Sequence, residues 1–274
     1  MLEWIVEPLR YAFMVRGLIA AVLVGATCAL VGSYVVLRGM TFLGDALAHA
    51  ILPGVAVAYL IAGSSPGALF WGGLIAGVGT ALGIGVITRG GQVKEDTAIG
   101  VLFAGMFALG IALISSVRNY SVDLTHFLFG NILAVSSADL VLIGLFGGLV
   151  LLLIVAFYKE FLVVSFDPIL AETLRLPTNF LRYLLLVMIA VTIVVSLQTV
   201  GVALMVAMLV TPAAAAHLLT RRLPTMMLLG VLIGAGSGIV GLYLSYYISI
   251  ASGAAIVLTC TAVFILAYLF RIRK

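Results

Sequence analysis

The sequence has 274 residues, of which 64% are hydrophobic and only 9% are charged, whereas a soluble domain carries roughly 25% charged residues. With a mean hydropathy of +1.34, this composition excludes a water-soluble domain, a disordered chain, a coiled coil and a secreted disulfide scaffold. The net charge of +4 comes from 14 basic and 10 acidic residues. Charges this sparse give information on the orientation of a membrane protein, and they do not indicate binding to nucleic acid.

Nine apolar stretches are long enough for a membrane-spanning helix, which needs about 20 apolar residues. The sixth and seventh are separated only around Gln198, so they could form one bent element, and eight spans are an alternative to nine. The expected fold is an all-α, multi-pass membrane protein with a single transmembrane domain over residues 1–274. The stretches cover roughly residues 14–37, 44–62, 67–88, 97–117, 134–157, 179–197, 199–219, 225–247 and 253–270.

The first residues do not resemble a secretory signal peptide, because Glu3 and Glu7 stand where a basic region would be. Residues 3–16 are expected to form an amphipathic lead-in at the membrane interface. With nine spans, 11 of the 14 basic residues fall at one set of helix ends and 3 fall at the other. The positive-inside rule then places the larger set and the C-terminus in the cytoplasm, and the N-terminus outside.

Asp45 and His49 are the outstanding ionisable pair inside an apolar run. Ionisable groups at membrane depth are costly and tend to mark functional sites. The i, i+4 spacing places both side chains on one helical face, about 5–6 Å apart, and a carboxylate with an imidazole suits Mn²⁺ or Zn²⁺. A two-fold dimer with this face on its axis would supply two of each. The alternative is a hydrogen-bonded pair that only fixes packing.

Two nearby features extend this hypothesis. Pro53 cannot donate a hydrogen bond to the His49 carbonyl, and in lipid the freed carbonyl needs a partner. We therefore expect that carbonyl to face the same polar pathway. Asp123 and His126 form a second acid–imidazole pair, at i, i+3, in the longer external connection. They are candidates for a vestibule or gate, although Asp123 capping a short interfacial helix explains them as well.

The segment from Phe166 to Pro177 predicts a short cytoplasmic helix of about nine residues, too short and too polar to span the membrane. Asp167 is a good N-cap, and Pro168 suits the first helical position. Such an amphipathic helix suits docking into the groove of a partner, and lying on lipid is the alternative. The expected docking residues are Phe166, Asp167, Pro168, Leu170, Ala171, Glu172, Leu174 and Arg175.

Polar residues and proline also interrupt the later apolar runs. Gln198 could line a pathway or satisfy a turn, and Pro212 must kink or break its helix, as happens both along pathways and in packing kinks. His217, four residues before Arg221, is expected to be an interfacial residue near a helix C-terminus. The GxxxG pairs around Gly234 are expected to let helices pack closely within the chain rather than at a dimer face.

Several motifs of known chemistry are missing from the sequence. No glycine is followed by lysine, so there is no Walker A loop, and there is no HExxH or CxxC. The chain is therefore expected to be neither an enzyme nor the holder of a permanently bound cofactor. Any ATP hydrolysis that drives it must belong to another polypeptide.

Taken in order, the motifs of this chain resemble those of the permease subunits of metal-ion ABC importers, the manganese/zinc/iron or ABC-3 family. The resemblance covers essentially the whole chain. It rests on Val31 through Tyr34, Leu37 through Met40, Gly44 through Gly54, Glu95 through Gly100, Asp123 through Leu133, Phe166 through Pro168, Gln198 through Gly201, Val210 through Ala214 and Ser252 through Leu258.

The resemblance implies a type II importer-like permease in a bacterial cytoplasmic membrane. It implies a homodimer in membrane lipid that works with two ATPase subunits and an extracytoplasmic metal-binding lipoprotein. It also implies that Asp45 and His49 are metal ligands in the translocation path, and that the segment from Phe166 to Pro177 docks on the ATPase. Ser249-Ile250-Ala251 stands where many members carry Asp-x-Pro, which favours Mn²⁺ over Zn²⁺ as the transported ion.

Three other functions stay open at this point. An ion-gradient-driven secondary transporter would import without an ATPase and is expected to carry inverted repeats with further buried acids. An ABC permease for an organic metal chelate would not need Asp45 and His49 one turn apart. A purely structural membrane subunit would leave the short cytoplasmic helix unexplained.

Overall fold

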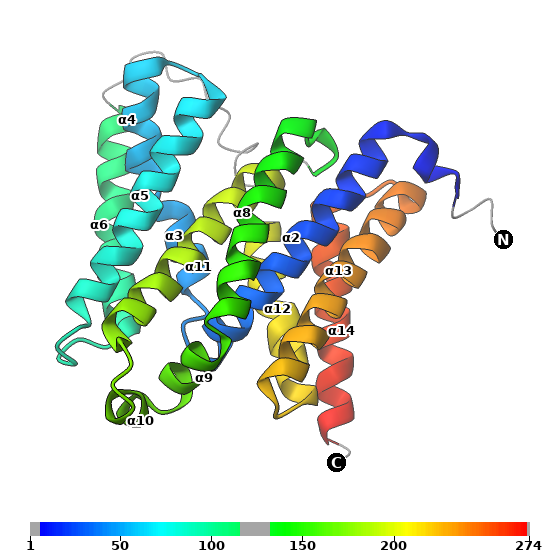
Figure 1. Cartoon of the computed structure of the whole chain (residues 1–274). Helices are drawn as coiled ribbons and strands as arrows, with labels where there is room; N and C mark the ends of the chain where they lie inside the picture. The colour runs from blue at the N-terminus through cyan, green and yellow to red at the C-terminus, as the bar shows by residue number, and fades with distance from the viewer. Residues whose placement is uncertain (1–5, 116–131, 273–274) are drawn as a thin grey trace. The chain divides into compact units, whose positions relative to one another are not determined.

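The structure is a computed structural model, and it describes residues 6–115 and 132–272. All regular structure in these ranges is helical, which confirms the expected fold class (Figure 1). The short helices are η1 (Pro8–Arg10) and η2 (Ile132–Ala134). The longer helices are α2 (Ala12–Leu37), α3 (Leu43–Ala50), α4 (Leu52–Ala62), α5 (Pro66–Ile87), α6 (Glu95–Ser115), α8 (Ser137–Ala156), α9 (Tyr158–Phe166), α10 (Pro168–Thr173), α11 (Thr178–Val200), α12 (Val202–Leu219), α13 (Leu223–Ile248) and α14 (Ser252–Ile272).

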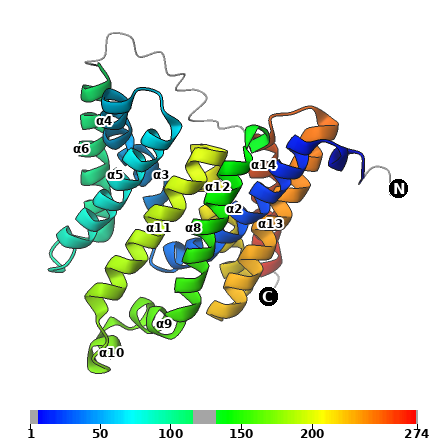
Figure 2. The ribbon, with the colours of Figure 1, turned by 45° about the horizontal axis from the view of Figure 1, so that its top comes forward.

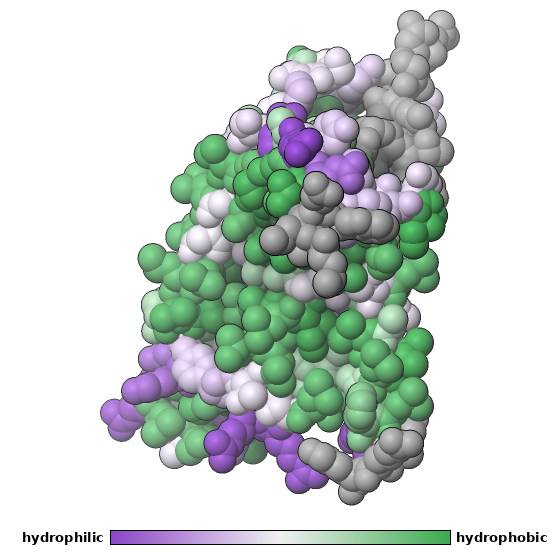
Figure 3. All heavy atoms as spheres, turned by 90° about the vertical axis from the view of Figure 1, so that its right-hand side faces the viewer, coloured by the Kyte–Doolittle hydropathy of each residue, from purple (hydrophilic) through white to green (hydrophobic). Residues whose placement is uncertain are grey.

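Within the described ranges, nine helical stretches are long and apolar enough to cross a membrane, counting α3 and α4 together as Leu43–Ala62. The sixth and seventh expected spans are distinct helices, because Gly201 with φ +82° separates α11 from α12. Only glycine adopts such a backbone conformation readily. Nine spans are therefore favoured over the alternative of eight. Figure 3 shows hydrophobic residues across the middle of one face, with hydrophilic residues gathered towards its ends.

The described residues belong to two compact units, and the expectation of a single domain stays a prediction. The first unit comprises Met1–Val36, Leu124–Leu152 and Ser196–Lys274. In it, α12, α13 and α14 contact one another, and α2 runs beside α13 in both ribbon views (Figures 1 and 2). Glycines allow this approach, since a Cβ on Gly234 would meet the Gly25 carbonyl oxygen at 2.6 Å, and one on Gly238 would meet the Ala21 Cβ at 2.9 Å. These glycines therefore pack inside the chain, as expected.

The second unit comprises Leu37–Asp123 and Leu153–Val195. Its α4, α5 and α6 pack side by side, and α3 contacts both α5 and α6 (Figure 2). Gly54 and Gly72 approach so closely that a Cβ on either would collide with the backbone of the other. In lipid, such contacts between small residues hold helices together, because apolar surface gains little by leaving lipid for protein. This unit contains Asp45 and His49 and the short helix predicted between Phe166 and Pro177.

Candidate metal centre

Asp45 and His49 lie one turn apart on α3, as their spacing predicts. The small residues Gly44, Ala46, Ala48 and Ala50 of the same helix are buried, so α3 packs closely while its two ionisable side chains stay partly open. The His49 side chain is 24% exposed and that of Asp45 is 40% exposed. His49 Nε2 lies 3.7 Å from Asp45 Oδ1, which is too long for a hydrogen bond. The lone pairs of the carboxylate and of the imidazole are therefore not used in a hydrogen bond between these two side chains.

Two aromatic rings on α6 flank the imidazole. The centroid of the His49 ring is 5.5 Å from that of Phe107, edge to face, and 6.0 Å from that of Phe103. The two phenyl rings stack on each other at 5.8 Å. Such contacts restrict the orientation of the imidazole. Neither phenylalanine was predicted as part of the site, because in an apolar run their i, i+4 spacing does not distinguish them from other side chains of the same helix.

The helix that carries the pair ends directly after it. Ile51 separates α3 from α4, and Pro53 lies in the first turn of α4. The His49 carbonyl accepts a hydrogen bond from the Ile51 N–H, so this carbonyl has a local partner besides any polar pathway. The chain therefore changes from one helix to another within four residues of His49, where Pro53 removes a donor.

The other candidate pathway residues are distributed differently. Asp123 and His126 lie outside the described residues. Gln198 is an exposed residue near the end of α11, and Pro212 is buried inside α12. Pro53 belongs to the same unit as Asp45 and His49, whereas Gln198 and Pro212 belong to the other unit. Across the described ranges, no group of three or more His, Cys, Asp or Glu side chains could hold a metal ion.

The short helix predicted between Phe166 and Pro177 is present as α10, but it has 6 residues where about nine were expected, and its cytoplasmic placement stays a prediction. Asp167 caps it as predicted, because its Oδ1 accepts a hydrogen bond from the Leu170 N–H at 2.9 Å. Pro168 opens the helix, and Leu174 caps its C-terminal end. The helix stops there because Arg175 has φ +55°, a left-handed conformation that ends the hydrogen-bond ladder.

The candidate docking residues mostly point outward. Phe166, Leu170 and Leu174 are 59%, 45% and 56% exposed, and Glu172 and Arg175 are also exposed. Ala171 is fully buried, so it anchors the helix to the chain rather than offering surface. Ile169, at 78% exposed, belongs to the same surface although it was not among the expected docking residues. Exposed apolar side chains concentrated in so short a segment are typical of an interaction surface.

Comparison with known proteins gives consistent matches along the chain. The model of the ABC 3 transport family matches residues 10–271. The manganese transport system membrane protein MntC of Halalkalibacterium halodurans is 48% identical over 265 residues, covering 96% of this chain and 89% of that protein. A Haemophilus influenzae protein named for an iron transport system membrane component is 39% identical over 267 residues, covering 97% of each.

A solved structure agrees with these sequence matches. The structure of PsaBC from Streptococcus pneumoniae in complex with Fab matches with a TM-score of 0.82 and 40% identity, covering 97% of this chain and 95% of that chain. The resemblance inferred from the motifs is thereby confirmed at the level of the family. The chain is a multi-pass protein of the bacterial cytoplasmic membrane and belongs to the ABC 3 transport family.

Proposed function

We propose that this chain is the permease subunit of an ATP-driven importer that moves Mn²⁺ into the cytoplasm. The observation that carries the proposal is the pair Asp45 and His49, partly open and one turn apart on a helix whose other residues are all apolar and buried. Membership of the ABC 3 transport family and identity of 48% to a protein named for manganese transport support it.

The donor chemistry of the pair suits a hard or borderline divalent ion. Carboxylate oxygen and imidazole nitrogen suit Mn²⁺, Fe²⁺ and Zn²⁺, and proteins discriminate among these by geometry and ligand number rather than by affinity alone. One chain supplies two ligands here, so a second copy related by two-fold symmetry would complete a site of four. The rings of Phe103 and Phe107 would hold each imidazole in place while the ion loses its water.

The energy for transport would come from partner subunits. The sequence lacks a phosphate-binding loop, and the exposed apolar surface of α10 with Phe166 suits docking of an ATPase on each of the two permease copies. An extracytoplasmic metal-binding lipoprotein would deliver the ion to the outer mouth. The chain itself would bind and pass the ion without catalysing a reaction.

The decisive experiment measures uptake of Mn²⁺, Zn²⁺ and Fe²⁺ into vesicles that contain the assembled importer. We expect Asp45→Asn and His49→Gln each to lower Mn²⁺ uptake at least about 10-fold, since loss of even an outer partner of a metal ligand costs about 10- to 100-fold. Asp96→Asn is the matched control, because Asp96 is an exposed carboxylate in the first turn of α6.

Three outcomes would contradict parts of the proposal. Wild-type Mn²⁺ uptake by both Asp45→Asn and His49→Gln would show that these two residues do not form the ion site. Uptake that persists without the ATPase would indicate a secondary transporter. Uptake of Zn²⁺ or Fe²⁺ in preference to Mn²⁺ by the wild-type importer would overturn the choice of ion while leaving the permease role intact.

A further inference from the structure

Two arginines converge on one glutamate in the second unit. Arg38 Nη2 lies 2.7 Å from Glu95 Oε1, and Arg182 Nη2 lies 2.9 Å from the same oxygen. Arg182 also donates to the Thr88 hydroxyl at 2.5 Å and to the Thr88 carbonyl at 3.4 Å. The cluster therefore joins the end of α5, the start of α6, the start of α11 and the residue that follows α2.

Glu95 is the only carboxylate that the described residues bring to these two guanidinium groups. The side chains of Arg38, Glu95 and Arg182 are between 14% and 23% exposed, so solvent screens the charges weakly. Burial lowers the pKa of the Arg38 guanidinium, Glu95 opposes that shift, and Arg182 adds to it. Without Glu95, two partly buried cations would face each other, which is strongly unfavourable.

The two arginines lead to different parts of the proposed machinery. Arg182 lies in the first turns of α11, which follows the docking segment directly along the chain. Arg38 precedes Gly39 and the buried Met40, whose carbonyl accepts the Leu43 N–H at the start of α3. Glu95 itself opens α6, the helix whose Phe103 and Phe107 flank His49. Through these two arginines, one carboxylate on α6 joins the helix that follows the docking segment to the stretch of chain that leads into α3.

We propose that Glu95, held between Arg38 and Arg182, is a positioning residue that transmits movement of α10 to Asp45 and His49. The inference rests on the proposed function of the chain as an ATP-driven permease. Networks of ion pairs carry coupling between distant sites when breaking them is costly enough that the joined elements move together. The stretches from Leu37 to Met40 and from Glu95 to Gly100 are among those that resemble the family, and neither the pair of Asp45 and His49 nor α10 explains them. The positioning role of Glu95 explains both.

The test compares transport with ATP hydrolysis in the same vesicles containing the assembled importer. We expect Glu95→Gln to lower the number of Mn²⁺ ions imported per ATP about 10-fold, within the range typical of coupling between sites. ATP hydrolysis and Mn²⁺ binding should stay within about twofold of wild type, because Glu95 belongs neither to the proposed docking surface nor to the proposed ligand pair. Arg182→Lys keeps the positive charge but loses the planar guanidinium that donates to Thr88 and Glu95 together. It should lower the number of Mn²⁺ ions imported per ATP by a smaller factor than Glu95→Gln.

The controls separate this inference from the proposed function. Asp96→Asn removes the neighbouring exposed carboxylate and should leave the ratio of ions to ATP unchanged. A wild-type ratio in Glu95→Gln, or a parallel loss of hydrolysis and uptake in both Glu95→Gln and Arg182→Lys, would overturn the positioning role. A wild-type importer that hydrolyses ATP without moving Mn²⁺ would instead overturn the proposed function.

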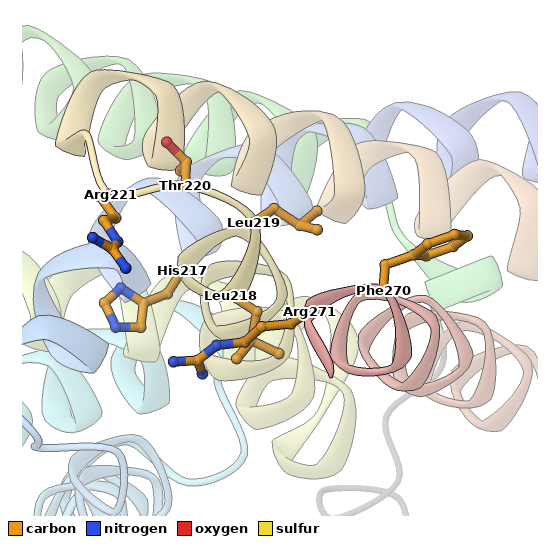
Figure 4. Close-up of a pocket in the computed structure, with 7 residues that line it drawn as sticks. All are labelled: His217, Leu218, Leu219, Thr220, Arg221, Phe270 and Arg271. Carbon is orange, nitrogen blue, oxygen red and sulfur yellow. The ribbon is translucent and has the colours of Figure 1, made fainter. Parts of the chain in front are cut away.

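A different feature lies in the first unit, where α12 and α14 end. A pocket of about 520 Å³ opens there, and Figure 4 shows the side chains of His217, Arg221 and Arg271 extending towards the same side of it. His217 is in the last turn of α12, as the sequence predicted. Among the described residues, the lining includes no Asp or Glu, and the ion pairs found there involve none of its side chains. Its residues are His217, Leu218, Leu219, Thr220, Arg221, Phe270 and Arg271.

The chemistry of this pocket matches a lipid phosphate. Arg221 and Arg271 each offer a planar fork of donors that fits phosphate oxygens. Leu219 and Phe270 are 48% and 63% exposed beside them, so they offer apolar contact to acyl chains. The distribution of basic residues places this end of the helices at the cytoplasmic leaflet, where anionic lipids concentrate. The geometry points to a binding site for the phosphate of an anionic phospholipid.

Native mass spectrometry of the full chain, titrated with cardiolipin, phosphatidylglycerol or phosphatidylcholine, tests the assignment. We expect the double variant Arg221→Gln with Arg271→Gln to bind the two anionic lipids about 30-fold more weakly, since each of the two basic residues contributes about 1 kcal/mol near a lipid surface. Arg89→Gln with Lys94→Gln removes two exposed charges from the connection between α5 and α6 and should bind like wild type.

The remaining outcomes each contradict the lipid assignment. Equal binding by both double variants would show that the pocket contributes nothing specific. Displacement of the lipid by millimolar inorganic phosphate would identify a site for a free anion. Loss of ATPase assembly in the Arg221→Gln and Arg271→Gln variant, with lipid binding unchanged, would make the pocket a protein-docking surface.

Discussion

Gly234 lies where α13 approaches α2 closely. A Cβ on Gly234 would meet the Gly25 carbonyl oxygen at 2.6 Å, and backbone atoms cannot give way as a flexible side chain can. We therefore expect Gly234→Ala to destabilise the protein by about 1–3 kcal/mol, the usual consequence of overpacking. Thermal unfolding of the purified chain in detergent measures the change.

Gly236 is the matched control on the same helix. A Cβ there meets nothing within 4 Å, and replacing a helical glycine with alanine removes an intrinsic penalty of up to about 1 kcal/mol. Gly236→Ala should therefore leave stability unchanged or raise it slightly. Equal melting temperatures for Gly234→Ala and Gly236→Ala would show that α2 and α13 can move apart at no cost in stability. The close approach of the two helices would then contribute nothing to stability.

Single residues differ in how far the sequence reveals them. Asp45 and His49 stand out because ionisable residues are rare in apolar runs, and their spacing fixes a shared face of one helix. Phe103 and Phe107 do not stand out, since in lipid every face of a helix is apolar and periodicity no longer identifies the inner one. The pairing of Arg38 with Glu95 joins residues 57 positions apart, and one sequence carries no record of such a contact.

Among the helices, the break between α3 and α4 is the one that lies nearest to Asp45 and His49 along the chain. Pro53→Ala would restore an N–H that can donate to the His49 carbonyl, which favours one continuous helix through Ile51. Because this would change how α3, which carries both Asp45 and His49, is joined to α4, we expect lower Mn²⁺ uptake or an altered ratio of Mn²⁺ to Zn²⁺ uptake. Competitive uptake of the two ions into vesicles measures both quantities.

Pro66 provides the comparison for this variant. It opens α5 after Ser65, at a helix start where the missing N–H has no intrahelical partner to lose. Pro66→Ala should therefore transport like wild type. If Pro53→Ala also kept wild-type uptake and ion preference, the break would be a packing kink without a role in the pathway.

The N-cap of α10 is Asp167, whose side chain orders the first turn of this short helix. Asp167→Ala removes the acceptor for the Leu170 N–H, and loss of an N-cap costs about 1 kcal/mol of helix stability. We expect the ATPase to bind the variant about 5-fold more weakly, because the docking helix must then be ordered on binding. Affinity of the purified ATPase for the detergent-solubilised permease measures the effect.

Asp167→Asn should bind the ATPase nearly as wild type, since asparagine caps as well as aspartate. If the asparagine variant were instead as weak as the alanine variant, the charge of Asp167 rather than its cap would matter. The cap itself followed from local sequence, as did the proline at the first position. The length of α10 did not follow, because the left-handed backbone of Arg175 that ends it is adopted by a residue with no glycine-like preference for it.

At the scale of the whole molecule, the sequence predicted the number of spans better than their grouping. Nine apolar runs correspond to nine candidate spans in the described ranges. The division into two units, each built from separate stretches of chain, had no counterpart in composition. Every span has similar hydropathy, so apolar runs say where helices cross the membrane but not which helices pack together.

The chain is predicted to cross the membrane with its N-terminus outside and its C-terminus in the cytoplasm, and cysteine labelling tests this orientation directly. The native Cys28 and Cys260 are 0% and 1% exposed, so they should contribute little background. Ser64 lies between α4 and α5, and Gln92 lies between α5 and α6, both exposed. With basic residues in the cytoplasm, a membrane-impermeant maleimide should label Ser64→Cys in intact cells and Gln92→Cys only after permeabilisation. The reverse pattern would invert the molecule and place α10 outside, where no ATPase could reach it, whereas labelling of both positions in intact cells would show that α5 does not cross the membrane.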